Sequence, residues 1–139
     1  MQKVVVDTNV LVSALIQRSY PYFIITHFLT ERKFEWCISG ELFQEYYEVL
    51  NRKKFSRYPE FVVKAETLLT FIEEKATVFS PKKKLHIITD VGDNKLLELS
   101  VESRAGFLIT GNINDFTMDH YKRTQIVTPK DYWQNYCPQ

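Results

Sequence analysis

Near its N-terminus the sequence reads VVVDTNV at residues 4–10. Three successive β-branched apolar residues are typical of a strand that is buried on both faces, as in a parallel sheet. Asp7 would then lie at the carboxyl end of that strand, the edge where open α/β sheets bind ligands. A carboxylate in such a place is costly unless its charge is compensated, and a metal ion commonly compensates it. The alternative interpretation is that Asp7 is a turn or cap residue before the next helix.

The rest of the chain alternates between strand-like and helix-like segments. Strands are predicted at residues 4–6, 35–38, 77–79, 107–110 and 125–127. Helices are predicted at residues 10–17, 22–32, 41–50, 60–76, 93–103 and 129–136. This alternation favours an α/β fold with a parallel sheet that is covered by helices on both faces. Since no linker or repeat is visible, residues 1–139 are expected to form a single domain.

The composition excludes some classes of protein. With 45% hydrophobic and 14% aromatic residues the chain can fill a sizeable core, and no apolar run approaches the ~20 residues that cross a membrane. The 18 basic and 17 acidic residues give a net charge of +1. This balance gives no support to a strongly basic nucleic-acid binder, yet it suits a local acidic site with basic rims. Cys37 and Cys137 have no disulfide or metal-site spacing, so free thiols in the cytoplasm are expected.

Further acids follow the other predicted strands. Glu45 lies in the predicted helix 41–50 beside its apolar stripe, where a solvated glutamate is the alternative. Asp90 and Asp93 precede or open the next helix, and one of them is expected to be its N-cap. Asp115 follows the strand at 107–110, where turn formation would also favour it. Together these acids predict an oxygen-rich site for hard divalent cations, which can activate water for phosphodiester hydrolysis.

Four segments, in order, resemble the motifs of PIN-domain nucleases. They are VVVDTNVLVSA at 4–14, residues 39–50 with Glu45 six positions after Ser39, DVGDNKLLEL at 90–99 and ITGNINDF at 109–116. The resemblance covers nearly the whole chain. It is closest to the PIN-family proteins that are classed as toxin components of bacterial toxin–antitoxin pairs.

This resemblance implies a three-layer α/β/α sandwich around a central parallel sheet. It also implies an endoribonuclease that depends on Mg²⁺ or Mn²⁺, with Asp7, Glu45, Asp93 and Asp115 as its catalytic acids. Of these, Asp7, Asp93 and Asp115 are expected to bind the metal. The residues expected to support them are Thr8, Asn9, Asp90, Thr110 and Asn112.

The last motif departs from many relatives, which have Thr-Gly-Asp where this chain has Thr-Gly-Asn at residues 110–112. Asn112 offers a carbonyl oxygen but no charge, and Asp115, three residues later, is expected to be the fourth acid. The loss of a charge leaves an alternative function: a catalytically weak or inactive PIN-like module that binds RNA or protein.

Partners are expected to include RNA, a cognate antitoxin and a second copy of the chain. Arg52, Lys53 and Lys54 are the candidate RNA-binding residues, with a solvated surface turn as the alternative. The run of lysines at 82–84 is interpreted as a solvated loop. The segment 20–29 is more apolar than one buried helix face demands, so it is a candidate for a dimer or antitoxin surface, with core packing as the alternative.

Overall fold

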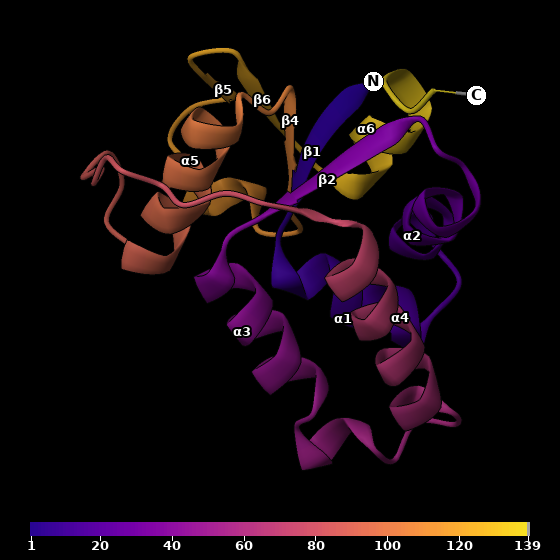
Figure 1. Cartoon of the computed structure of the whole chain (residues 1–139). Coiled ribbons are helices and arrows are strands. Elements are labelled where there is room, and N and C mark those ends of the chain that lie inside the picture. Colours follow the sequence, from indigo (N-terminus) through magenta and orange to yellow (C-terminus); the bar gives the residue numbers. More distant parts are fainter. Residues whose placement is uncertain (139) are drawn as a thin grey trace.

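A computed structural model describes residues 1–138 and shows a central, mostly parallel sheet. The six strands lie in the order β3-β2-β1-β4-β6-β5 (Figure 1). Their bounds are β1 (Gln2–Val6), β2 (Phe34–Ile38), β3 (Thr77–Val78), β4 (Phe107–Ile109), β5 (His120–Tyr121) and β6 (Thr124–Val127). The first four pairings along this order are parallel, and β5 runs antiparallel to β6.

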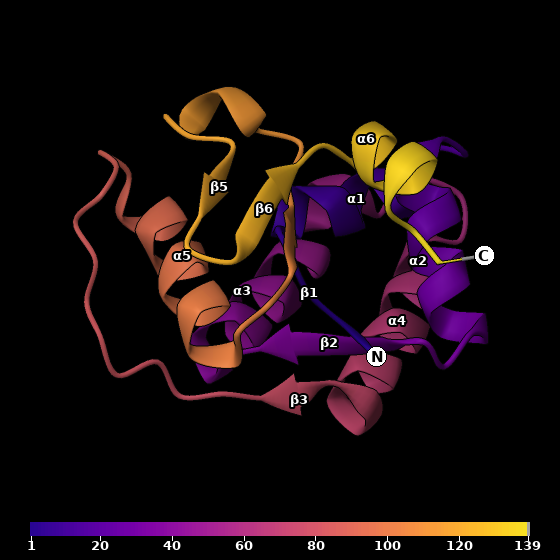
Figure 2. The same ribbon diagram turned by 90° about the horizontal axis from the view of Figure 1, so that it is seen from above.

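Helices cover both faces of the sheet. They are α1 (Thr8–Ile16), α2 (Tyr20–Thr30), α3 (Gly40–Leu50), α4 (Phe61–Lys75), α5 (Val91–Ser103) and α6 (Pro129–Asn135), with short 3₁₀ turns η1 (Lys53–Phe55) and η2 (Ile113–Asp115). Figure 2 shows α5 on one side of the sheet and α1, α2 and α6 on the other. The predicted α/β fold is therefore confirmed. None of the helices in residues 1–138 has the length and apolar character to cross a membrane.

The three valines near the N-terminus lie in a strand that is buried on both faces, as predicted. This strand lies in the interior of the sheet. Val4, Val5 and Val6 have no solvent-exposed surface. Their strand β1 pairs with β2 on one side and with β4 on the other. Burial on both faces is what a run of β-branched residues favours, because such side chains pack well on a pleated surface.

The antiparallel hairpin of β5 and β6 was not predicted from the sequence. Its register pairs His120 with Gln125 and Tyr121 with Thr124, so the turn is made by Lys122 and Arg123. Lys122 adopts a left-handed backbone with φ 53°. Gly and Asn are the residues that normally indicate such a turn. Lys122 and Arg123 are neither, so the sequence did not indicate a hairpin here.

The order of the strands creates a switch point beside β1. After β1 the chain builds β2 and β3 on one side, and later returns to build β4 and β6 on the other. The crossovers on the two sides therefore diverge, which opens a crevice at the carboxyl ends of β1 and β4. Asp7 and Thr110 follow these two strand ends directly.

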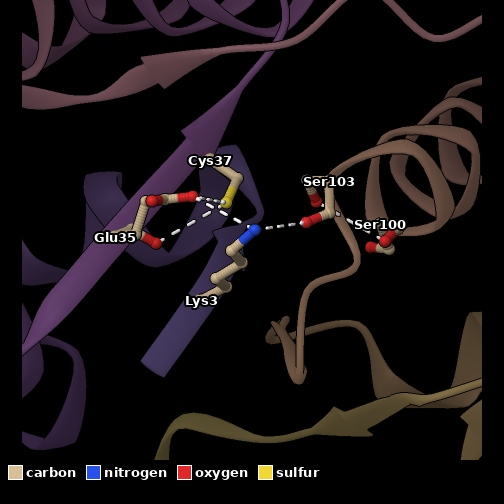
Figure 3. A network of polar contacts seen from close by, with 5 residues as sticks. All are labelled: Lys3, Glu35, Cys37, Ser100 and Ser103. Atoms are coloured by element: carbon tan, nitrogen blue, oxygen red, sulfur yellow. Dashed lines mark hydrogen bonds and ion pairs between the residues drawn. The ribbon is translucent and has the colours of Figure 1, made fainter. Parts of the chain in front are cut away.

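A polar network at the other end of β1 fixes α5 to the sheet (Figure 3). Lys3 Nζ donates to the carbonyl of Ser103, in the last turn of α5, and lies 3.6 Å from Glu35 Oε2 on β2. A cation at this end of a helix is favourable because the helix dipole is negative there. Cys37 lies beside Glu35, and burial raises the pKa of its free thiol to about 11. The network holds α5 so that its first turn reaches the switch point.

Tyr46 ties α3 to the end of β1 and to the middle of β2. Its ring is fully buried, and its hydroxyl donates to the carbonyl of Val6 at 2.5 Å. The same hydroxyl accepts from Trp36 Nε1 on β2 at 3.3 Å. Since Glu45 is the preceding residue, this anchoring also sets where Glu45 lies.

Replacing Tyr46 with phenylalanine is expected to lower the free energy of unfolding by about 1–3 kcal/mol, because it leaves the buried Trp36 N–H without its acceptor. Urea denaturation of wild type and Tyr46→Phe measures this loss. The control is Tyr47→Phe on the same helix, whose side chain is 53% exposed and whose change should stay within about 0.5 kcal/mol. Equal losses in the two variants would contradict the anchoring role.

Candidate functional site

Asp7 lies at the carboxyl end of β1 with only 8% of its surface exposed. It occupies the N-cap position of α1, but its side chain makes no capping hydrogen bond. Instead Thr110 Oγ1 donates to Asp7 Oδ2 at 2.8 Å, because the pairing of Val6 with Ile109 sets the two residues side by side. Burial raises the pKa of Asp7, the bond from Thr110 acts against this, and the charge of Glu45 raises it further.

Glu45 reaches the same place from α3. The hydroxyl of Thr8, a buried residue in the first turn of α1, donates a hydrogen bond to Glu45 Oε2. Ser39 caps α3 by accepting from the Leu42 amide at 3.0 Å. Leu42 then packs in the core and leaves Glu45 at the edge of the buried face, beside Asp7.

Asp90 and Asp93 divide two tasks at the start of α5. Asp90 Oδ1 accepts from the Asp93 amide at 3.0 Å, so Asp90 is the N-cap and the carboxylate of Asp93 is left for the site. The pKa of Asp93 is raised to about 6, first by burial and then by the charges of Asp90, Asp7, Asp115 and Glu45. Carboxylates from four segments therefore act on each other electrostatically.

The loop after β4 folds over Asp7. Asn9 Oδ1 accepts from the Gly111 amide at 3.2 Å, and Thr110 Oγ1 accepts from the Asn112 amide at 3.0 Å. Asn112 is exposed on this loop, and Asp115 is exposed in η2. The predicted supporting residues Asn9 and Thr110 thus hold the loop beside the acids.

The structure brings three of the four predicted catalytic acids into one cleft. Asp7, Glu45, Asp93 and Asn112 line this cleft, which has a volume of about 770 Å³. Asp115 lines a neighbouring hollow together with Asp90 and Asp93, and it is close enough to raise the pKa of both Asp7 and Asp93. Arg52, Lys53 and Lys54 follow the C-terminal end of α3, at η1, and none of them lines the cleft.

A PIN domain family profile matches residues 3–114, which include the first three motifs and most of the fourth, and which end one residue before Asp115. The chain belongs to the PIN domain family. Proteins of this family are generally nucleases, and they generally use divalent metals.

A solved structure has a similar fold to this PIN domain. It is the crystal structure of VapBC2 from Rickettsia felis bound to a DNA fragment from their promoter. The match covers 91% of this chain and 98% of that one, with a TM-score of 0.56 and 18% sequence identity. No curated protein sequence matches the chain.

The donor types in this PIN domain fit a hard divalent cation. All the candidate ligands are carboxylate oxygens, which Mg²⁺ and Mn²⁺ prefer. Burial and then the charges of the neighbouring acids raise the pKa of Asp7 and of Asp93, so a cation beside these two carboxylates would offset real repulsion. Within residues 1–138, no group of three or more His, Cys, Asp or Glu side chains is arranged so that it could hold a metal ion.

Asn94 is a positioning residue that sequence reasoning missed. Its side chain is 5% exposed, and its Oδ1 accepts from the amides of Ile87 and Ile88 at 3.0 and 3.1 Å. Its Nδ2 donates to the carbonyls of Ile88 and Asp90. The signal was present but weak, since Asn94 lies three residues before the buried Leu97, on a helix side that also buries the polar Ser100 and Ser103.

Asp93→Asn is expected to raise the melting temperature of the metal-free protein at neutral pH. Because the folded-state pKa of Asp93, about 6, lies above its ordinary value of 3.8, the folded form holds this proton more tightly. The contribution of Asp93 to stability therefore falls as pH rises from about 4 to 6, and the ionised form is destabilising above that window. Thermal melts in EDTA at about pH 4 and pH 7.5 measure the difference.

Two comparisons control this measurement. Glu73→Gln, at an exposed position on α4, removes one negative charge outside the cleft and should leave the melting temperature nearly unchanged. Added Mg²⁺ should raise the melting temperature of wild type more than that of Asp93→Asn, because a ligand stabilises the form that binds it. If Asp93→Asn melts at a lower temperature than wild type at pH 7.5, the ionised carboxylate of Asp93 is not destabilising and the interpretation is wrong.

Proposed function

We propose that this chain is a metal-dependent endoribonuclease that hydrolyses RNA phosphodiester bonds, and that it acts as the toxin component of a toxin–antitoxin pair. One observation carries the proposal: Asp7, Glu45 and Asp93, from three distant parts of the sequence, line one cleft at the switch point of the sheet. Membership of a family of nucleases supports the reaction. RNA as the substrate is supported by the resemblance of the four motifs to PIN-family toxins.

Each acid has a proposed role. Asp7, Asp93 and Asp115 would hold Mg²⁺ or Mn²⁺, which when bound lowers the pKa of water and neutralises charge on a phosphate oxygen. The bond from Thr110 orients Asp7 and opposes the rise in its pKa that burial causes. Thr8 orients Glu45, which we assign as the group that accepts the proton of the attacking water. No covalent intermediate is needed, so in-line attack would leave a 3′-hydroxyl and a 5′-phosphate.

Asp115 is the proposed replacement for the charge that Asn112 lacks. Its carboxylate raises the pKa of both Asp7 and Asp93, so it belongs to the same electrostatic cluster. Asn112 lines the cleft and offers a neutral oxygen to a water or a phosphate. If Asp115 does not supply the charge, the alternative is a weak or inactive module that binds without cutting.

A labelled single-stranded RNA incubated with Mg²⁺ or Mn²⁺ is expected to be cut by wild type and to stay intact in EDTA. Asp7→Asn should reduce kcat/KM by about 10²-fold or more, because it removes a charged ligand while keeping the acceptor for Thr110. Glu66→Gln, exposed on α4 and outside the cleft, is the control and should cut normally.

The same assay separates the two last-motif residues, since Asp115→Asn should lose more activity than Asn112→Ala. A reversed order would assign the role to Asn112. Products with a 2′,3′-cyclic phosphate, or cutting that persists in EDTA, would rule out the mechanism. RNA binding without cutting in any metal would favour the alternative function.

We also propose an antitoxin partner, self-association and a cytoplasmic location. The similar solved structure is of VapBC2, and this name denotes two components. The likeness therefore supports a protein partner. In the candidate segment 20–29, Ile24, Ile25 and Phe28 are buried in the core, so core packing explains part of its apolar character. Phe23 contacts Trp133 of α6 at 5.7 Å between ring centroids but stays 39% exposed, and Leu29 stays 38% exposed. These two side chains are the proposed contact for the partner.

Co-expression with the product of the adjacent gene is expected to give a complex that co-purifies, and Phe23→Asp with Leu29→Asp should disrupt it. Circular dichroism checks that this variant remains folded. Val63→Asp on α4, also an exposed apolar position, should not disrupt the complex. A monomer by light scattering at high concentration, with no co-purifying product, would refute both the partner and the dimer.

A further inference from the structure

We propose that Lys82, Lys83 and Lys84 form a phosphate-binding rim that holds the RNA strand beside the acids of the cleft. We call these three residues the lysine rim. The inference rests on the proposed function and adds to it a sequence-independent binding site for the backbone of the substrate. The sequence alone had indicated only a solvated loop.

The location of the lysine rim is the first argument. The three lysines lie in the connection between β3 and α5, which has no helix or strand of its own. All three side chains are exposed, and all three line the same cleft as Asp7 and Asp93. Figure 2 shows this connection running along the outer side of α5. The rim is therefore beside the proposed site of reaction.

The backbone of the connection is held in place, which a merely solvated loop does not require. The amide of Lys82 donates to Glu102 Oε1 at 3.2 Å, and the amide of Leu85 donates to Glu98 Oε2 at 2.9 Å. Asn94 holds the part that follows. All three acceptors belong to α5, the helix that carries Asp93. A rim fixed in this way loses less conformational entropy when it binds a strand.

Among the described residues, the cations of the rim form no close ion pairs with carboxylates, although the charge of Lys84 contributes, after Lys95, to lowering the pKa of Glu41. Within residues 1–138, none of the three lysines has a carboxylate oxygen within 4.0 Å. Lys95, which also lines the cleft, differs because it forms an ion pair with Glu41 of α3. The three ammonium groups of the rim therefore remain able to bind phosphates.

The charge of the cleft explains why such a rim is needed. Asp7, Glu45 and Asp93 would repel a polyanion, and a metal ion acts only at the scissile phosphate. Cations along one wall offset the repulsion for the neighbouring phosphates. Lysine suits this task because its ammonium is a point charge on a flexible stem, which contacts phosphate without reading the base. The near-zero net charge of the chain conceals this local separation of charge.

The test measures RNA affinity in an Asp7→Asn background and in EDTA, where the strand is expected to stay intact. Fluorescence anisotropy of a labelled single-stranded RNA is recorded between about 50 and 200 mM salt. In Lys82→Gln/Lys83→Gln/Lys84→Gln, affinity should fall and the slope of log K against log salt should become shallower by about 0.7 for each lost contact, about 2 in all. A DNA strand of the same sequence should show the same change, since the rim contacts phosphates.

The matched control removes three exposed lysines outside the cleft, as Lys64→Gln/Lys75→Gln/Lys130→Gln. It should change the slope little. An unchanged slope in the rim variant, or equal changes in both variants, would overturn the proposal. So would a loss of slope confined to Arg52→Gln/Lys53→Gln/Lys54→Gln, which would assign the contacts to η1 instead.

Cleavage is measured separately, with Asp7 restored, so that the two proposals can fail independently. The rim variant should raise KM and retain kcat at saturating RNA, because the lysines hold the strand and do not touch the reacting atoms. If wild type cuts nothing while the salt slope still depends on the rim, the proposed nuclease fails and the rim stands. A loss of kcat in the rim variant, with KM unchanged, would overturn the rim as a binding site.

Discussion

The central constraint on this molecule is a carboxylate at the end of a strand whose last three residues have no contact with solvent. Asp7 must be buried because β1 lies in the middle of the sheet, and burial raises its pKa. Thr110 relieves part of the cost, while Glu45 adds to it. The concentration of negative charge at this site therefore lowers the stability of the fold. Reactive sites commonly reduce protein stability in this way.

Much of this arrangement could be predicted because local patterns determine it. Three valines specify a doubly buried strand, and an aspartate that follows such a strand must lie at the ligand-binding edge. The roles of Asp90 and Asn94 depended on the path of the loop before α5, which periodicity does not describe. For the same reason the lysines at 82–84 were interpreted as solvent-facing. The hairpin of β5 and β6 was missed because Lys122 takes a backbone conformation usually signalled by glycine.

One helix, α5, links the two kinds of charge in the cleft. Its first turn carries Asp93, and its outer side holds the connection that bears the lysine rim through Glu98 and Glu102. Lys3 fixes the opposite end of the helix to the sheet. The same rigid helix thus positions Asp93 and holds the backbone of the connection that bears the lysine rim.

The pairing of Val6 with Ile109 has a consequence for how this sequence can change. Successive side chains of a strand point to opposite faces, so an insertion of one residue in β4 would turn Thr110 away from Asp7 and move a core residue into its place. Composition and hydrophobicity would hardly change, yet the carboxylate would lose its partner. The connection between β3 and α5 is not a strand, so a change in its length does not turn side chains to the opposite face. Its length can therefore vary. Divergence among related chains should therefore concentrate in that connection, while β1 and β4 keep a fixed length.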